Sequence, residues 1–125
     1  MTFHPDHFTV WIEIPVTDMA RATKFYEDVL LTKLRLDETG PNPVAFFVTK
    51  EDDKGIAGHL YPGKPAPRGT GSTVHLITPD TLEDTMKRVK KAGGQVLSPA
   101  IPIPSGRFFY IEDLDGNSVG FFEVT

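Results

Sequence analysis

Two stretches of this 125-residue chain follow the same pattern, and that repeat restricts the possible folds more than any other feature. Each stretch begins with a segment rich in β-branched or aromatic residues, which is typical of a buried strand. An aspartate then precedes an amphipathic helical segment, and short strand-like segments follow. The two aspartates, Asp18 and Asp80, take equivalent places in the two stretches. The order therefore predicts two copies of one structural unit.

The first copy spans about residues 7–61. Residues 8–16 predict a strand, and Thr17-Asp18 predicts the N-cap of a helix over about 19–30. The apolar positions of that helix recur every three or four residues, as in the buried stripe of an amphipathic helix. They are Met19, Ala22, Tyr26, Val29 and Leu30. Three more strands are predicted at 32–37, 43–50 and 56–61.

The second copy, about residues 73–124, follows a connector at 62–72 that is too rich in proline and glycine for a helix or central strand. Asp80 and Glu83 form a D-x-x-E capping signal for a helix over about 81–92, and Gly93-Gly94 ends that helix. Its expected buried stripe is Leu82, Met86 and Val89. The other expected elements are strands at 73–78, 95–98, 107–113 and 118–124, a rigid connection over Pro99–Pro104, and a tight turn at 115–117.

The predicted fold class is α+β, with residues 1–125 forming one domain of two βαβββ modules. Each module is expected to be a small curved mixed sheet with one helix on its outer side. Two such sheets whose concave faces meet enclose a cavity, which is the usual kind of place for a small-molecule ligand.

Composition excludes several function classes. The chain has no cysteine, so it holds no disulfide, thiol nucleophile or thiolate metal site. Its net charge is −4 with the charges scattered, which argues against a nucleic-acid partner. No apolar run approaches the roughly 20 residues of a membrane span, and no leader pattern is visible. We therefore expect a cytoplasmic protein with a small-molecule ligand and no membrane or nucleic-acid partner.

Three segments resemble the glyoxalase/bleomycin resistance protein/dioxygenase superfamily, also called the vicinal oxygen chelate superfamily. The first is IEIPVTDMARATKFYEDVL, and the second is VHLITPDTLEDTMKRVKKAGGQVL. The third, FFYIEDLDGNSVGFFE, looks like the E-D-P-D-G-N turn and final strand of that family, with Leu114 where proline is usual. The resemblance covers nearly the whole chain and implies the fold. It implies less about activity, because the fold hosts lyases, dioxygenases, epimerases, thiol transferases and drug-binding proteins.

The resemblance also implies four positions for metal ligands, one in each of four strands. Counting from Asp18, Asp80 and Asp113 places three of them at Trp11, Val74 and Gly120, none of which coordinates a metal. The fourth is His59 in the strand at 56–61. His75 and Glu123 lie near two of these positions but have the opposite strand parity, so we expect them to face away. The sequence thus favours a glyoxalase-like subgroup without the usual metal ligands. No cofactor is expected, and a divalent metal held partly by Glu13 and His59 is disfavoured.

Glu13 and His59 are the candidate catalytic residues, although an ordinary half-buried strand histidine is the more common interpretation of His59. Glu13 stands in an otherwise apolar strand, where burial is expected to raise its pKa and suit it to be a general base or a ligand anchor. An ion pair that only holds the pocket together is an equally good interpretation of Glu13. The side chains expected to line the ligand site are Trp11, Glu13, Phe46, His59, Val74, Leu76, Arg107, Phe109, Gly120 and Phe122.

Three functions remain after these observations. The first is a small-molecule-binding protein of the bleomycin-resistance type without the catalytic metal. The second is a lyase or isomerase related to lactoylglutathione lyase, with Glu13 as base or with a metal held partly by Glu13 and His59. The third, a glyoxalase I-like metalloenzyme, is the least favoured. The resemblance also implies a homodimer. The ligand, and whether the modules pair within one chain or between chains, stay open.

Overall fold

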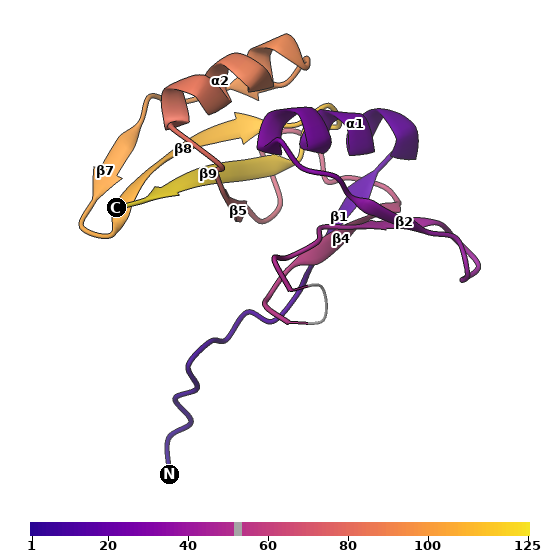
Figure 1. Cartoon of the computed structure of the whole chain (residues 1–125), viewed down its shortest axis with the longest axis horizontal. Helices are drawn as coiled ribbons and strands as arrows, with labels where there is room; N and C mark the ends of the chain where they lie inside the picture. The colour runs from indigo at the N-terminus through magenta and orange to yellow at the C-terminus, as the bar shows by residue number, and fades with distance from the viewer. Residues whose placement is uncertain (52–53) are drawn as a thin grey trace.

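The computed structural model describes residues 1–51 and 54–125, and its elements form two separate sheets with one helix each (Figure 1). The first sheet has the strand order β1-β4-β3-β2, with β1 parallel to β4 and the other pairs antiparallel. Its elements are β1 (Ile12–Val16), α1 (Met19–Leu30), β2 (Arg35–Asp37), β3 (Val44–Phe46) and β4 (Gly58–Pro62).

The second sheet repeats this topology with the order β5-β9-β8-β6, and β5 again runs parallel to its neighbour β9. An additional short strand, β7, pairs with β8. The elements are β5 (Val74–Ile77), α2 (Leu82–Lys91), β6 (Gln95–Val96), β7 (Ile101–Ile103), β8 (Gly106–Glu112) and β9 (Ser118–Val124). The predicted α+β class with two mixed sheets is therefore confirmed.

Two local predictions are wrong. The connection over Pro99–Pro104 contains a strand, because Pro102 lies opposite Arg107 on a short outer strand, where a missing N–H is tolerated. The N-cap of α2 is Thr81 and not Asp80, since the Thr81 side chain accepts the hydrogen bond from the Asp84 N–H. Most of the predicted strands are also longer than the observed ones, and β1 begins only at Ile12.

The core lies between the helices and the sheets and joins both modules into one cluster. Both helices contact each other and cover the same side of the structure (Figure 1). The predicted helix stripes are largely buried, with Phe25 and Thr85 added to them. We call the side of each sheet turned away from the helices its open face. No helix within the described residues is long and apolar enough to cross a bilayer.

The turn between β8 and β9 ties the second module to the first. The Tyr26 hydroxyl on α1 donates a 2.6 Å hydrogen bond to Asp113, and both groups are buried. The Asn117 amide donates to the Pro15 carbonyl at 2.8 Å, and Asp115 accepts from the Thr17 hydroxyl at 2.5 Å. Burial, followed by the Asp113 charge, raises the pKa of Tyr26 well above its usual value, so the phenol stays a donor.

Candidate functional site

The parallel pairing of β1 with β4 places Glu13 directly beside His59. Side chains alternate between the two faces of a strand, and the neighbours Ile14 and Leu60 are buried against the helices. Glu13 and His59 therefore emerge together on the open face of the first sheet. The pairing of β3 with β4 adds Phe46 opposite His59 on the same face.

Four of the predicted ligand-site residues meet here, and a fifth residue joins them. The Trp11 indole N–H donates to His59 Nδ1 at 3.0 Å, and His59 Nε2 lies 3.2 Å from Glu13 Oε1. The Phe46 ring lies 5.6 Å from the His59 ring and 6.1 Å from the Trp11 ring, and the Tyr61 ring lies 6.2 Å from His59. We call these five residues the Glu13–His59 cluster.

The hydrogen bond from Trp11 fixes the proton on His59. An indole nitrogen only donates, so Nδ1 of His59 must accept and carries no proton. The ring proton then sits on Nε2, which lies 3.2 Å from Glu13 Oε1. In this arrangement His59 is a neutral imidazole in close contact with the Glu13 carboxylate. The expectation that Glu13 is desolvated is wrong, because its side chain is 65% exposed.

Two cavities adjoin Glu13. A cavity of about 420 Å³ lies between the cluster and the segment that joins β2 to β3. Its lining residues are Glu13, Asp37, Thr39, Gly40, Pro41, Asn42, Val44, His59, Tyr61 and Pro62. A smaller cavity of about 160 Å³ lies between β1, the connector and the second sheet, and Val74 and Ser118 line it together with Glu13.

The open face of the second sheet carries its own aromatic group. The His75 ring lies 5.3 Å from Phe108 and 5.9 Å from Tyr110, and Phe122 stacks on Phe108 at 6.3 Å. His75 pairs with Gly120, and a Cβ on Gly120 would overlap its ring. Gly120 and Phe122 thus lie on an open face, but on that of the other sheet. Among the described residues, no hydrogen bond or ring contact joins this group to the Glu13–His59 cluster.

His75 is expected from the sequence to face the helix or a partner subunit. The structure excludes the helix side, because His75 lies opposite Gly120 on the open face while its neighbour Leu76 packs against the core. The spacing from strand to helix differs between the modules: Trp11 stands seven residues before the cap Asp18, whereas His75 stands six residues before the cap Thr81.

The remaining predicted site residues lie on the helix side of the second sheet. Phe109 is completely buried in the core, and Leu76 packs against that core beside Phe121. Val74 pairs with Val119 and lines the smaller cavity together with Glu13. The predicted place of Phe109 and Leu76 in one ligand site with the Glu13–His59 cluster is therefore corrected.

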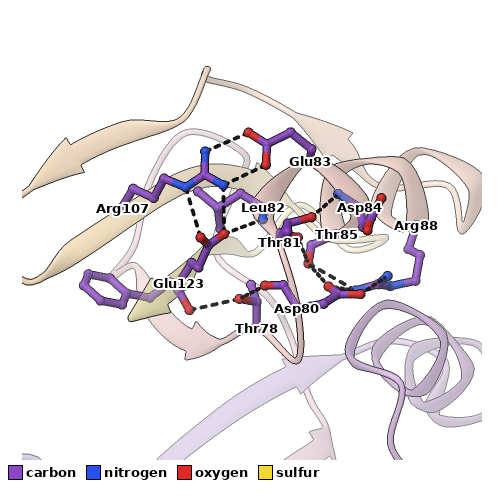
Figure 2. Close-up of polar contacts among 11 residues, drawn as sticks. Thr78, Asp80, Thr81, Leu82, Glu83, Asp84, Thr85, Arg88, Arg107 and Glu123 are labelled. Carbon is purple, nitrogen blue, oxygen red and sulfur yellow. Dashed lines mark hydrogen bonds and ion pairs between the residues drawn. The ribbon is translucent and has the colours of Figure 1, made fainter. Parts of the chain in front are cut away.

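Arg107 belongs to a charged network at the start of α2 (Figure 2). Its guanidinium donates to both carboxylate oxygens of Glu83 at 2.7 Å and to Glu123 at 3.0 and 3.2 Å. Glu123 in turn accepts from the Leu82 N–H, one of the free donors at the helix start. Arg107 is thus committed to structure and does not reach the cluster, which corrects its predicted ligand-binding place.

The Arg107 network predicts a loss of stability in acid. Hydrogen bonds from Arg107 hold the pKa values of Glu83 and Glu123 below their ordinary value of 4.5. A lowered folded-state pKa stabilises the protein above the unfolded pKa, and this contribution disappears as the pH falls through the folded pKa. In Arg107→Met, we expect a melting temperature a few degrees lower at pH 7, with the gap to the unsubstituted protein closing below about pH 4.5.

The measurement is thermal unfolding of both proteins between pH 7 and pH 3. Lys24→Met is the control, because Lys24 makes an exposed ion pair with Asp28 on α1. A gap between Arg107→Met and the unsubstituted protein that stays constant over this range would contradict the assignment.

Of the residues at the metal-ligand positions that the resemblance implies, Trp11 and Gly120 have no ligating side chain. Nδ1 of His59 accepts the Trp11 indole N–H, and Nε2 lies 3.2 Å from Glu13 Oε1. Within residues 1–51 and 54–125, no group of three or more His, Asp or Glu side chains is close enough to hold an ion. His75 adds one imidazole, but on the other sheet.

Sequence reasoning missed two contributors to the site. Tyr61 stands two residues after His59, so strand alternation alone could have placed it on the same face. Asp37 and residues up to Val44 line the 420 Å³ cavity because β2 and β3 fold back beside β4. No local sequence pattern indicates that these residues lie near Glu13.

Comparisons with known proteins agree with this fold. The model of the glyoxalase/bleomycin resistance protein/dioxygenase superfamily matches residues 5–121. A glyoxylase-like domain-containing protein of Didymella fabae is 32% identical over 120 residues, and a lactoylglutathione lyase of Haemophilus influenzae is 30% identical over 118, each match covering 86% of both chains. The crystal structure of a glyoxalase/bleomycin resistance protein from Albidiferax ferrireducens superposes with a TM-score of 0.74 at 17% identity, covering 95% of this chain and all of that one. This chain belongs to the glyoxalase/bleomycin resistance protein/dioxygenase superfamily.

Proposed function

We propose that this protein binds a small organic molecule in the 420 Å³ cavity beside Glu13 and does so without a catalytic metal. One observation carries the proposal: the Trp11 indole N–H donates to His59, and His59 Nε2 lies 3.2 Å from the Glu13 carboxylate. A metal at Nδ1 of His59 would have to displace the indole N–H. The Glu13 carboxylate beside His59 lines the cavity, where a ligand can reach it.

We also propose that the protein is a homodimer. The open faces expose apolar side chains, and Ile77 on β5 is 68% exposed next to the rings of Phe108 and Phe122. Contiguous exposed apolar surface on a small protein usually marks an interaction site. A second copy that covers these faces would give a particle of twice 13.8 kDa in solution.

The only tryptophan of the chain makes this proposal directly testable. A ligand in the cavity changes the surroundings of the Glu13–His59 cluster, so we expect ligands found in a thermal-shift screen to alter Trp11 fluorescence in a saturable way. Protein purified without chelators is expected to contain far less than one equivalent of zinc, nickel or iron. Stoichiometric metal that is lost in His59→Ala, or a screen without any ligand, would contradict the proposal.

A second candidate is a lyase or isomerase with Glu13 as the base. The observation in its favour is that one Glu13 carboxylate oxygen lies 3.2 Å from His59 Nε2, which leaves the other oxygen of this 65% exposed side chain available for a proton from the substrate. The 30% identity to a lactoylglutathione lyase also supports this class. Glu13→Gln separates the two functions. If Glu13 is a base, Glu13→Gln loses turnover and largely keeps its affinity for the substrate. If Glu13 is a binding anchor, Glu13→Gln binds the ligand more weakly, and neither the variant nor the unsubstituted protein shows turnover.

A further inference from the structure

The charge of the Glu13–His59 cluster follows from the hydrogen bond between Trp11 and His59. Because the indole N–H of Trp11 points at Nδ1, His59 cannot carry a second ring proton without placing two donors against each other. The contact between His59 and Glu13 therefore joins a neutral imidazole to a carboxylate, and the negative charge of Glu13 is not balanced by its partner.

No cationic side chain in the described lining of the 420 Å³ cavity balances this charge. The described lining contains a second carboxylate, Asp37, and neither lysine nor arginine. Hydrogen bonds from the hydroxyl and N–H of Thr39 lower the pKa of Asp37, so Asp37 is ionised at neutral pH. Arg35 lies over the Phe46 ring at 5.2 Å, and its charge also contributes to the lowered pKa of Asp37, but it is not among the lining residues. The described lining itself thus has two anionic side chains on a concave surface, which concentrates negative potential there.

The walls between the two carboxylates are apolar and aromatic. Tyr61, Val44, Pro41 and Pro62 line the cavity, and the Tyr61 ring stands edge-on to His59. Aromatic faces attract flat apolar groups and organic cations, and a carboxylate beside them adds a charge-assisted hydrogen bond to an ammonium group. The cavity thus offers an aromatic wall for a flat group of a ligand and a carboxylate for its positive charge.

We propose that the cavity beside Glu13 selects organic cations that carry a flat apolar group, such as an arylalkyl ammonium ion, over neutral or anionic molecules of the same shape. This inference rests on the proposed small-molecule binding and specifies its ligand class. The positive group would lie at Glu13 and the flat group on the wall formed by Tyr61 and its neighbours.

The test is a screen with probes matched in shape and different in charge. Its smallest set is phenethylamine, 2-phenylethanol and 3-phenylpropionate, and the same triplets are built on naphthyl and biphenyl groups. Melting temperatures select binders, and calorimetry gives their dissociation constants at pH 7. We expect the amines to bind at least tenfold more tightly than the matched alcohols and acids.

Two variants locate the effect. Glu13→Gln keeps the shape of the side chain, and we expect it to weaken amine binding at least tenfold while leaving the acids unchanged or slightly tighter. Glu51→Gln is the matched control, because Glu51 is 63% exposed beside Lys54 and lies outside the cavity lining, so it should change amine affinity less than twofold. A folded Glu13→Gln protein is verified by its melting temperature and by an unchanged elution volume.

The possible outcomes distinguish the selection of cations from the proposed binding of small molecules. Acids or alcohols that bind as well as the amines overturn the charge selection while small-molecule binding stands. Amines that bind equally to Glu13→Gln overturn the assignment to this cavity. A complete absence of binders in all triplets and in the wider screen removes both the ligand class and the proposed function.

Discussion

Asp113→Ala is expected to destabilise the protein by about 3–5 kcal/mol, one of the two largest effects that we predict for a single substitution. The Asp113 carboxylate is only 3% exposed and accepts four hydrogen bonds. They come from the Tyr26 hydroxyl, the backbone N–H groups of Asp115 and Asn117, and the Asn117 side chain. Alanine leaves these buried donors without their acceptor.

Denaturant unfolding of the variant measures the effect as a shift in midpoint at unchanged slope. Tyr26→Phe is the milder companion, because it removes one donor and keeps the ring, and we expect a loss of about 1–2 kcal/mol. Asp28→Asn on the exposed side of α1 serves as the control and should change stability by less than about 0.5 kcal/mol. A loss below about 1 kcal/mol in Asp113→Ala would refute a clamp between the modules.

The turn between β8 and β9, which holds the two modules together, illustrates which parts of the fold the sequence could predict. The Asp115-Gly116-Asn117 segment has the local chemistry of a tight turn, and the turn is there, with Gly116 at a φ of 84°. That the turn also binds Tyr26 and Pro15 depends on contacts 87 and 102 residues apart. Such contacts follow from the packing of the two modules, which local patterns do not encode.

The candidate site, too, has residues that the sequence could place and residues that it could not. Alternation within a strand correctly placed Trp11 and Glu13 on one face, and the parallel pairing of β1 with β4 then brought His59 to them. The face of His75 was not predicted, because the spacing from the open-face residue of the first strand to the helix cap is one residue shorter in the second module than in the first. Asp80 is not the cap of α2 and accepts two hydrogen bonds from Arg88, which lower its pKa.

Gly58→Ala is expected to damage stability and the site together, because Gly58 allows β1 and β4 to approach closely. A Cβ at this position would overlap the carbonyl oxygen and the side chain of Ile12, its register partner. The next pair along the two strands is Glu13 with His59. We expect a loss of about 3 kcal/mol from overpacking, and a displacement of His59 from the Trp11 indole.

Two measurements separate these consequences. Denaturant unfolding gives the stability, and the single indole N–H resonance of Trp11 reports the hydrogen bond to His59, so it should move upfield in Gly58→Ala. Gly40→Ala is the control, since Gly40 lines the same cavity but its added Cβ would find its nearest neighbour at 3.9 Å. Gly40→Ala should leave the resonance in place. An unmoved resonance in a destabilised Gly58→Ala would mean that the approach of β1 to β4 supports the fold without setting the geometry of the Glu13–His59 cluster.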